Sequence, residues 1–336
     1  MEKRIGYLAE LGKRLSTSAE AEDKVYRAEG RNPWFVPQFV KLALQAVITD
    51  MLDADKLQTW LANYTLKEVN KNVGLIFAGN VPLVGFHDFL CCYVAGCTIQ
   101  VKQSSKDDEL FPLLLKLLGE IDPDLNSRVT LVDTLKGYDA VIATGSDNTN
   151  RYFEYYFKNH PRILRKNRNS VAILTGNETD AELEALADDI FLYFGFGCRN
   201  VSKLYVPVDF DLTRLFPRFE AKYAWLHNHN KYRNNYDYNR TVLLLNKTPH
   251  LANEFIMVLE NSAIPSPIAT LHYSTWHDEE VLKSHLRQQA EQIQCISAAE
   301  PDKWGSPNVV AMGQTQHPGL ADYADGVDTL AFLLGL

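Results

Sequence analysis

The sequence predicts an α/β protein built on mostly parallel sheets, and two observations support this prediction. From about residue 73 onward, short apolar segments typical of strands alternate with amphipathic segments typical of helices. Such alternation favours right-handed crossovers between parallel strands. The composition, with 46% hydrophobic and 23% charged residues in a chain of 336, is ordinary for a soluble globular protein with room for two domains.

The expected elements follow from the spacing of apolar residues along the chain. Two amphipathic helices come first, over 34–52 and 55–64. The first alternating region has strands over 73–78, 98–102, 128–132 and 140–143, and helices over 83–94, 107–120 and about 148–158. The second half has strands over 171–174, 204–207, 242–245, 255–259, 268–273, 293–297 and 309–312, and helices near 179–194, 211–228 and 278–289. The polar stretch 227–240, rich in Asn and Tyr, is predicted to be a surface loop.

Net charge, apolar runs and cysteine spacing exclude several classes of protein. A net charge of -8 disfavours a nucleic-acid partner, which needs a basic face. Residues 1–13 lack the apolar core of a signal peptide and no later run is long enough to span a bilayer, so the chain is expected in the cytoplasm. The five cysteines show neither zinc-like spacing nor a disulfide framework, so thiols and no metal site are expected.

The stretch 195–200, with the sequence GFGCRN, places a lone thiol on a bend. A capping box at Thr179 and Glu182 starts the preceding helix, and the two glycines end it. Cys198 at such a turn, beside Arg199, has the partly open, electropositive surroundings that favour a thiolate. It is therefore a candidate nucleophile. The alternative is a small, buried and inert core residue.

Asn80 follows the first strand of the alternating region, within the sequence AGNVP at 78–82. The carboxyl edge of an open parallel sheet is where such sheets bind ligands. An asparagine amide at that edge can donate a hydrogen bond to a developing oxyanion. The same residue types are also those of an ordinary turn.

Residues suited to a cofactor follow the second strand, in the sequence VKQSSK at 101–106. The cation of Lys102 and the hydroxyls of Ser104 and Ser105 suit a ribose or its 2′-phosphate. Ser105 and Asp108 also have the spacing of a helix cap, so a capped helix with a solvated lysine explains the stretch as well.

Three more places are candidates for ligand contacts. Gly145 and Ser146 lie between a strand and a helix, where backbone N–H groups favour a phosphate, although a simple cap explains them equally well. The GxGxxG and P-loop patterns are absent from the sequence. A cationic run over 158–168 suits a phosphate-rich ligand such as coenzyme A, or else a solvated face. Glu260, at the end of a strand, faces either a bound ligand or water.

The order and spacing of these motifs resemble those of the aldehyde dehydrogenase superfamily. The motifs that carry the resemblance are Asn80-Val81-Pro82, Lys102 with Ser104 and Ser105, Gly145-Ser146, and Gly197-Cys198. Residues 73–206 and the sequence DYADGVD at 322–328 are more similar still to the LuxC-type acyl-CoA reductases. The resemblance covers about residues 70–330 and implies an aldehyde-dehydrogenase-like fold. It implies N-terminal helices and a Rossmann-type cofactor domain over 1–168, an α/β catalytic domain over 169–313 and a C-terminal tail over 314–336.

The resemblance also implies an activity, the NAD(P)H-dependent reduction of a fatty acyl-CoA thioester to an aldehyde. Cys198 would attack the thioester carbonyl, while Asn80 and the backbone N–H of Cys198 would hold the oxyanion. A nicotinamide cofactor would then supply hydride to the acyl-enzyme. The residues implied in binding this cofactor are Lys102, Ser104, Ser105, Gly145, Ser146 and Glu260.

Two departures from the family pattern refine this expectation. Hydrolytic aldehyde dehydrogenases carry a general-base glutamate, but the matching stretch here, RKNRN at 165–169, has none. Without that base, hydrolysis of the thioester should be slow, which favours an acylating reductase. Ser105 stands where many NAD-preferring relatives have glutamate, and Lys102 and Lys106 lie nearby, so NADPH is favoured and NADH remains possible.

Two alternatives stay open at this stage: a hydrolytic aldehyde dehydrogenase, and a non-catalytic nucleotide-binding scaffold subunit. The substrate is either free acyl-CoA or an acyl group delivered by a partner protein. Only about seventy residues precede the first strand motif, which leaves the homo-oligomeric state open. Acyl chain length depends on packing that no sequence pattern reports.

Overall fold

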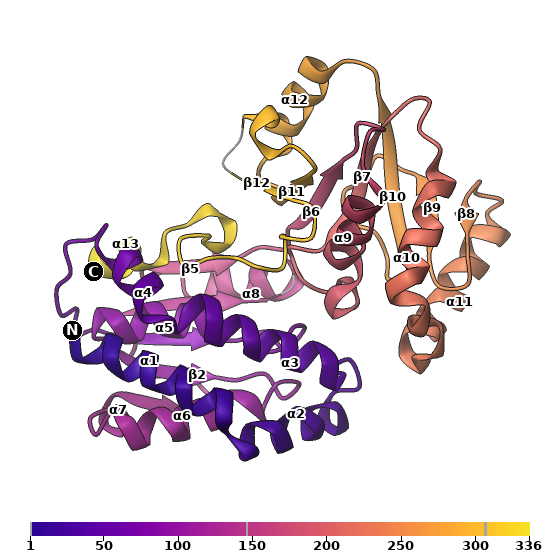
Figure 1. Ribbon diagram of the computed structural model, residues 1–336. Coiled ribbons are helices and arrows are strands. Elements are labelled where there is room, and N and C mark those ends of the chain that lie inside the picture. The colour runs from indigo at the N-terminus through magenta and orange to yellow at the C-terminus, as the bar shows by residue number, and fades with distance from the viewer. Residues whose placement is uncertain (1, 146, 306–307) are drawn as a thin grey trace. The chain divides into compact units, whose positions relative to one another are not determined.

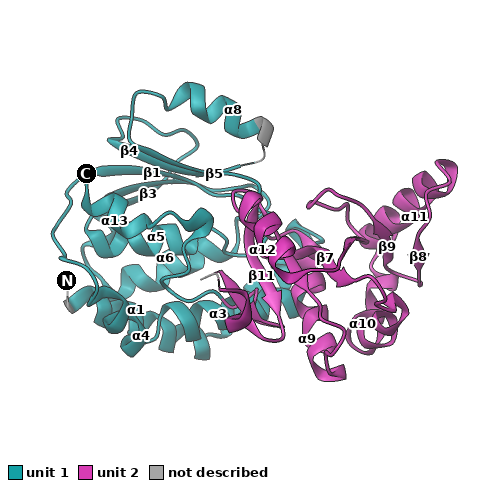
Figure 2. Cartoon of the chain, turned by 90° about the horizontal axis from the view of Figure 1, so that it is seen from above, with its two compact units in different colours: residues 1–167, 318–336 teal, residues 168–317 magenta. Residues whose placement is uncertain are grey.

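The computed structural model describes residues 2–145, 147–305 and 308–336 (Figure 1). The chain forms two compact units, coloured teal and magenta in Figure 2. Unit 1 comprises Met1–Asn167 and Pro318–Leu336, and unit 2 comprises Arg168–His317. The C-terminal tail is predicted over 314–336, and residues 318–336 of it pack within unit 1, because α13 (Thr329–Leu334) buries Leu330 and Leu333 in the core of that unit.

Unit 1 begins with a layer of helices before its first strand. These are α1 (Glu2–Thr17), α2 (Ala19–Arg31), α3 (Pro37–Ala46), the π-helical turn η1 (Val47–Met51) and α4 (Ala54–Leu61). The Ser18 side chain starts α2 by accepting a hydrogen bond from the N–H of Ala21. The apolar spacing predicts helices over 34–52 and 55–64 but none over the first 31 residues, where α1 and α2 lie.

The centre of unit 1 is a five-stranded parallel sheet in the order β3-β2-β1-β4-β5. Its strands are β1 (Asn72–Ile76), β2 (Thr98–Lys102), β3 (Val129–Leu131), β4 (Ala140–Thr144) and β5 (Arg162–Arg165). The helices that follow are α5 (Phe86–Ala95), α6 (Leu110–Ile121), the short α7 (Leu125–Arg128) and α8 (Asp147–Tyr156). In Figure 2, α8 lies on one side of this sheet and α5 and α6 on the other. This is the arrangement expected of a Rossmann-type domain.

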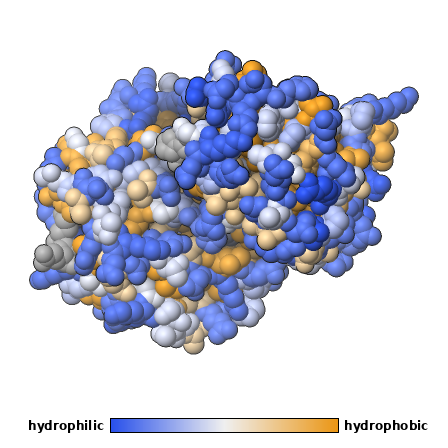
Figure 3. Space-filling view, turned by 45° about the horizontal axis from the view of Figure 1, so that its top comes forward, coloured by the Kyte–Doolittle hydropathy of each residue, from blue (hydrophilic) through white to orange (hydrophobic). Residues whose placement is uncertain are grey.

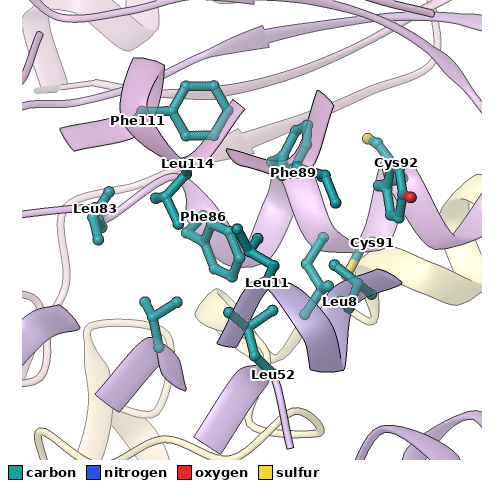
Figure 4. Close-up of a cluster of buried hydrophobic side chains, with 14 of the residues drawn as sticks. Leu8, Leu11, Leu52, Leu83, Phe86, Phe89, Cys91, Cys92, Phe111 and Leu114 are labelled. Carbon is teal, nitrogen blue, oxygen red and sulfur yellow. The ribbon is translucent and has the colours of Figure 1, made fainter. Parts of the chain in front are cut away.

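The main core of unit 1 lies where α1, α5 and α6 pack together, as Figure 4 shows. Phe89 of α5 and Phe111 of α6 meet edge to face, with ring centroids 5.1 Å apart. Every residue of α5 from Asp88 to Ala95 is buried, which explains why its sequence is apolar on all sides. Burial of this helix against the sheet is what positions the loop before it, which carries Asn80.

Unit 2 is built on a seven-stranded sheet in the order β12-β11-β6-β7-β10-β9-β8, parallel except for the last pair. Its strands are β6 (Asn169–Ile173), β7 (Val201–Pro207), β8 (Leu251–Ala252), β9 (Met257–Glu260), β10 (Thr270–Trp276), β11 (Ile293–Ala298) and β12 (Val309–Ala311). Its helices are α9 (Asp180–Phe191), α10 (Leu215–Tyr223), α11 (Asn230–Leu245) and α12 (Glu279–Gln288). Short 3-10 turns are η2 (Leu192–Gly195), η3 (Leu212–Arg214), η4 (Ala224–Asn228) and η5 (Pro301–Trp304), with η6 (Ala324–Gly326) in unit 1.

The structure differs most from the sequence prediction at residues 227–245. The stretch 227–240 was predicted to be a loop and 242–245 a strand, but α11 covers most of both. The side chain of His229 caps this helix by accepting a hydrogen bond from the N–H of Tyr232. Tyr232 and Tyr236, four residues apart, are buried on one face of the helix. Aromatic rings carrying a polar atom therefore supply the apolar face that a count of aliphatic residues misses.

The surface seen in Figure 3 is mostly hydrophilic, with scattered hydrophobic residues. Within the described ranges, no helix combines the length and apolar character needed to cross a bilayer. The described residues also contain no group of three or more His, Cys, Asp or Glu side chains arranged to hold a metal ion.

Candidate active site

The structure places Cys198 on the turn 196–200, between η2 and the start of β7. Cys198 is partly exposed, whereas the other four cysteines, all described, are buried. Burial raises the pKa of the Cys91 and Cys92 thiols well above the ordinary value, so these thiols stay protonated and unreactive. Among the cysteines, Cys198 is therefore the one suited to act as a nucleophile.

Asn200 stabilises the cysteine turn through both ends of its amide. Its side-chain Oδ1 accepts a hydrogen bond from the N–H of Gly197 at 2.8 Å, and the backbone N–H of Asn200 donates to the Gly197 carbonyl at 3.0 Å. Its Nδ2 donates to the carbonyls of Asp189 at 3.1 Å and Leu192 at 2.8 Å, at the end of α9. Asn200 is only 1% exposed, so these bonds are shielded from water. One side chain thus joins the helix end to the turn.

The backbone before the turn is strained. Tyr193, Phe194 and Gly195 follow one another with φ of 54°, 58° and 78°. Only glycine adopts this left-handed region cheaply, and each other residue there costs about 1–2 kcal/mol. The prediction that Gly195 and Gly197 end the helix is partly wrong, because α9 already ends at Phe191 and only Gly195 of the two has positive φ.

Two more contacts fix the cysteine turn within unit 2. Ser170 Oγ, at the start of β6, donates to the carbonyl of Cys198 at 3.1 Å. Arg199 Nε donates to the carbonyl of Thr315 at 2.6 Å. The buried carboxylate of Asp189 in turn accepts the N–H of Thr315 at 3.0 Å and its hydroxyl at 2.8 Å. Arg199, whose positive charge is predicted to favour the Cys198 thiolate, therefore has a structural role in this turn.

Three strand ends meet at one edge of the sheet in unit 1. Ile76, the last residue of β1, lies opposite Lys102 of β2 and Ala143 of β4. The loops after β1 and β2 carry Asn80 and Ser104, so these candidates gather at the carboxyl edge of the sheet. Since chain connections leave β1 and β4 in opposite directions, this edge is the switch point at which open parallel sheets bind ligands.

The turn that carries Asn80 lies close against the loop after β2. A Cβ on Gly79 would lie 2.8 Å from the Cβ of Ser104, closer than real side chains come, so the approach requires glycine. The Asp107 carboxylate accepts the N–H of Leu83 at 2.8 Å and so stabilises the end of the Asn80 turn. Burial raises the pKa of Asp107 to about 6.

The other candidates in the loop after β2 differ in their contacts. Lys102 Nζ donates to the Asp133 carbonyl at 2.6 Å, and Ser104 Oγ accepts the N–H of Lys106 at 3.2 Å. Ser105 is exposed. The predicted helix cap at Ser105 and Asp108 is wrong, because α6 begins later, at Leu110, and no side chain caps it. The loop instead closes on itself through a bond from Asp107 N–H to the Ser104 carbonyl.

Gly145 follows β4 and packs against Thr149 and Phe153 of α8. A Cβ on Gly145 would lie 3.0 Å from the ring of Phe153 and 3.1 Å from Thr149. The buried Asn150 donates to the carbonyls of Gly145 at 3.3 Å and Arg165 at 2.7 Å, which joins α8 to the ends of β4 and β5. Ser146 lies outside the described residues.

Glu260 lies at a distance from the cysteine turn, although both belong to unit 2. Glu260 is opposite Tyr273 of β10, which is opposite Leu204 of β7. Leu204 is three residues beyond Val201, about 10 Å along the strand from the end that carries Cys198. Two inter-strand spacings, also about 10 Å, separate β9 from β7. The side chain of Glu260 is exposed at the end of its strand.

The cationic run over 158–168 forms β5 and its flanks, and two of its arginines are structural. Arg165 is buried and donates to the Asp88 carboxylate at 2.7 Å, to the Thr329 hydroxyl at 2.7 Å and to the Ala324 carbonyl at 2.6 Å. Arg162 donates to the Lys158 carbonyl at 3.2 Å. These contacts stabilise unit 1. Lys158, Arg162 and Lys166 are nevertheless exposed, so the solvated or phosphate-binding face stays a prediction for them.

Four supporting side chains were missed by the sequence analysis: Asn150, Ser170, Asp189 and Asn200. Their bonds connect segments that are far apart in sequence, such as Asp189 and Thr315. No spacing pattern reports such pairs. Asn200 alone had a local indication, since it lies two residues after the cysteine on the same predicted bend.

These features define the chain as an α/β protein with a parallel sheet of the cofactor-binding type in one unit and a cysteine-bearing turn in the other. Its sequence matches the LuxC acyl-CoA reductase family over residues 13–214. This match spans more than half of the chain, so the protein belongs to that family and is an enzyme of the acyl-CoA reductase class. A search of curated proteins found no match.

Several solved structures with the same fold are aldehyde dehydrogenases. A Mycobacterium tuberculosis aldehyde dehydrogenase, solved with NAD+, has 14% identity and a TM-score of 0.65 over 88% of this chain and 72% of that one. Aldehyde dehydrogenase 21 from Physcomitrella patens, solved with succinate, has 11% identity and a TM-score of 0.69, with 99% of this chain and 84% of that one covered. The P. syringae indole-3-acetaldehyde dehydrogenase has 15% identity and a TM-score of 0.60 over 88% and 71%. The predicted aldehyde-dehydrogenase-like fold is thus confirmed.

Proposed function

We propose that this enzyme reduces an acyl-CoA thioester to an aldehyde through a covalent acyl-enzyme on Cys198. One observation supports the proposal above all: Cys198 is the cysteine that is not buried, and it lies on a turn fixed by Asn200 and Ser170. Family membership supplies the class of substrate. A fixed and accessible thiol is what nucleophilic attack requires.

In the first step, Cys198 Sγ attacks the carbonyl carbon of the thioester. The new carbon–sulfur bond forms as the carbonyl oxygen takes up negative charge, which the Cys198 backbone N–H and the Asn80 amide would stabilise. The bond to coenzyme A then breaks, and its thiolate leaves and is protonated by solvent. After reduction, the Cys198 sulfur leaves the former acyl carbon, which frees the aldehyde and restores the thiolate.

The carboxyl edge of the sheet in unit 1 fits a nicotinamide dinucleotide. The glycine at position 79 keeps the backbone open to close approach, and the buried Nε2 of Gln103 has no hydrogen-bond partner among the described residues. Lys102, Ser104, Ser105, Gly145 and Ser146 would hold the ribose and phosphates, and Glu260 the nicotinamide ribose. When bound, the reduced cofactor supplies the hydride that converts the acyl group to an aldehyde.

No carboxylate occupies the stretch that matches the general base of hydrolytic relatives. The position that carries a general base in hydrolytic relatives falls in the stretch 165–169, and Arg165 there is buried against Asp88. Without a carboxylate to take a proton from water, the thioester survives long enough for reduction. Carboxylate production from aldehyde in the absence of coenzyme A would instead favour the hydrolytic alternative.

Labelling with a radiolabelled acyl-CoA tests the acyl-enzyme directly. Cys198→Ser should remove the acid-stable label from the protein, whereas Cys97→Ala, which removes a buried thiol, should retain it. Label at the wild-type level in Cys198→Ser would exclude Cys198 as the nucleophile. A protein that bound cofactor but never took up label would be the non-catalytic scaffold.

The preference for NADPH is tested at Ser105, which is exposed in the loop after β2. Ser105→Glu places a carboxylate where a 2′-phosphate would lie, and like charges repel. We expect the ratio of kcat/KM for NADPH to that for NADH to fall at least tenfold. Ser16→Glu, a matched change at an exposed position of α1, should leave the ratio unchanged. A wild-type enzyme that prefers NADH would contradict the NADPH proposal.

A further inference from the structure

Helix α11 has two apolar faces, and one of them is exposed. Tyr232 and Tyr236 face the interior of unit 2 and are at most 2% exposed. Tyr238, Val242 and Leu245, spaced i, i+4 and i+7, lie on the opposite side and are 69%, 37% and 77% exposed. Figures 1 and 2 place α11 at one end of unit 2, and Figure 3 shows hydrophobic surface at that end. A helix on the surface of a globular unit normally has only the first kind of face.

The exposed apolar residues gather toward the C-terminal end of α11. Leu244, which is 58% exposed, adds a fourth side chain to the three on the exposed face. We call Tyr238, Val242, Leu244 and Leu245 the α11 patch. Single exposed apolar residues are ordinary on a protein surface, whereas a group of them on one element indicates an interaction site.

The helix is ordered up to its last turn. The N–H of Lys247 donates to the Leu244 carbonyl at 3.1 Å, and the N–H of Thr248 donates to the Leu243 carbonyl at 2.9 Å. Lys247 itself has φ of 52°, the left-handed conformation that closes many helix ends. A hydrogen-bonded helix end therefore presents the leucines of the patch to solvent.

The charges around the α11 patch are mostly positive. The helix contains Lys231, Arg233 and Arg240, and its one acidic residue, Asp237, forms an ion pair with Arg233 at 3.0 Å. From residue 238 to residue 253 the sequence has no Asp or Glu, and Lys247 follows the patch directly. The net charge of the whole chain is -8, so this segment departs from the acidic balance of the rest. The patch therefore suits a partner that is apolar and negatively charged.

We propose that the α11 patch docks the enzyme on an anionic lipid surface. The leucines would enter the boundary between headgroups and acyl chains, Tyr238 would lie at the level of the headgroups, and Lys247 would meet the lipid phosphates. An apolar stripe accompanied by lysine and arginine is the pattern of helices that lie in the plane of a membrane interface. This inference goes beyond the chemistry proposed at Cys198 and does not depend on it.

A second copy of the chain fits the patch less well than lipid does. A stable dimer buries about 800 Å² on each partner, contributed by about 20–30 residues, and the α11 patch has far fewer. A two-fold interface pairs the same surface on both copies, so it would bring the cations of two patches together. Lipid binding needs only a few inserted side chains and attraction to anionic headgroups.

Co-sedimentation of the enzyme with sucrose-loaded vesicles tests the proposal. The enzyme should bind vesicles of phosphatidylcholine with about one third phosphatidylglycerol, and should bind pure phosphatidylcholine at least fivefold more weakly, as the loss of about one cation contact implies. Leu245→Ser should lower the partition coefficient about tenfold, because the leucine no longer leaves water on binding. Lys247→Gln should lower it about fivefold on the anionic vesicles only. Val281→Ser, at a position of α12 that is 68% exposed, is the matched control and should bind as the wild type does.

Fluorescence shows which face of the enzyme meets the lipid. Tyr238→Trp should gain emission that brominated phospholipids quench, because its ring would lie at the headgroup level. Tyr152→Trp, at a position of α8 that is 66% exposed, should gain emission that these lipids leave unquenched. The urea concentration of half-unfolding should be the same in Leu245→Ser and the wild type, which separates a lost surface contact from a damaged fold.

Three results would overturn the proposal: no vesicle binding by the wild type, equal binding by the wild type and Leu245→Ser, or quenching at position 152 in place of 238. If analytical ultracentrifugation shows that Leu245→Ser dissociates a dimer while vesicle binding is unchanged, the occupant of the patch is a second copy, and the proposal is wrong. Labelling of Cys198 by acetyl-CoA should be equal in Leu245→Ser and the wild type. Failure of that labelling in the wild type would contradict the proposed function and leave the lipid measurements to stand by themselves.

Discussion

The two turns that carry the predicted catalytic residues are stabilised by different chemistry. The turn with Asn80 follows β1 and is stabilised by the Asp107 carboxyl group through the N–H of Leu83. The turn with Cys198 precedes β7 and is stabilised by the uncharged amide of Asn200. Asp107 ionises in the acidic range and Asn200 does not, so the direct support of the Asn80 turn should depend on pH and that of the cysteine turn should not. The Asp189 carboxylate acts on the cysteine turn only indirectly, through Thr315 and Arg199.

Breaking the uncharged support should have the largest effect. Asn200→Ala removes the donors and the acceptor that join the turn to α9 and leaves buried backbone groups without partners, at about 1–3 kcal/mol for each. We expect the rate of Cys198 acylation to fall more than a hundredfold and unit 2 to lose roughly 3 kcal/mol of unfolding free energy. Acylation rates with labelled acyl-CoA and urea unfolding measure the two effects.

Asn200→Asp refines this experiment. The carboxylate keeps an acceptor for the N–H of Gly197 but loses the donors to Asp189 and Leu192 and buries a charge. The unfolding free energy of Asn200→Asp should therefore be no higher than that of Asn200→Ala. Acylation at the wild-type rate in either variant would mean that the turn keeps its shape without the amide.

The Asn80 turn can be disturbed without touching a hydrogen bond. Gly79→Ala would bring a Cβ to 2.9 Å from the Cβ of Lys106, so the loop after β2 must move. We expect NADPH to bind about tenfold more weakly, a cost of roughly 1.4 kcal/mol, and acylation of Cys198 without cofactor to slow as well, because the displaced turn carries the Asn80 amide proposed to hold the oxyanion. Fluorescence titration with NADPH measures the first effect and acyl labelling the second.

Gly119→Ala is the matched control for that experiment. Gly119 lies within α6, where a Cβ would lie 3.4 Å from the nearest atom, an ordinary contact. This change should leave NADPH binding unchanged and stabilise the helix slightly, because alanine favours helix more than glycine does. Equal weakening in both glycine variants would show that the close approach at Gly79 has no special role.

The same contrast explains what the sequence could and could not predict. In unit 1, strands and helices alternate with clear apolar spacing, so the order of elements and the carboxyl edge with Asn80, Lys102 and Gly145 follow from the pattern. In unit 2, α11 buries tyrosines instead of aliphatic residues, so the helical spacing of its buried face does not show in the pattern of aliphatic residues. The position of Cys198 on a bend was predictable, because glycines and a capping box are local features.

The supports of the turns were beyond prediction for a physical reason. Ser170 reaches the Cys198 carbonyl from 28 positions away in the chain, and Asp189 reaches Thr315 from 126 positions away. Their side chains meet only because strands β6, β7 and β11 adopt neighbouring places in the sheet. Hydrogen bonds of this kind are set by tertiary packing, and residue spacing carries no information about them.

Asp107 provides the smallest and most specific test of the comparison. Burial raises its pKa from the ordinary 3.8 to about 6, so the folded protein binds a proton that the unfolded chain has already released. The contribution of the protonated carboxyl to stability is therefore full below pH 4 and is lost as the pH rises through about 6. Asp107→Asn keeps an oxygen for the N–H of Leu83 without the charge. It should raise the unfolding free energy of unit 1 at pH 7.5 by about 2 kcal/mol and leave it nearly unchanged at pH 4.

Urea unfolding at the two pH values, followed by tryptophan fluorescence, measures this difference. Asp108→Asn, an exposed neighbour, should show no such pH-dependent gain. The cysteine turn supplies the second control, since alkylation of the Cys198 thiol by iodoacetamide, which does not use the Asn80 amide, should respond to pH in the same way in Asp107→Asn and in the wild type. A change in that profile would show that the carboxyl group of Asp107 influences both turns, and the distinction between an ionisable and an uncharged support would then be wrong.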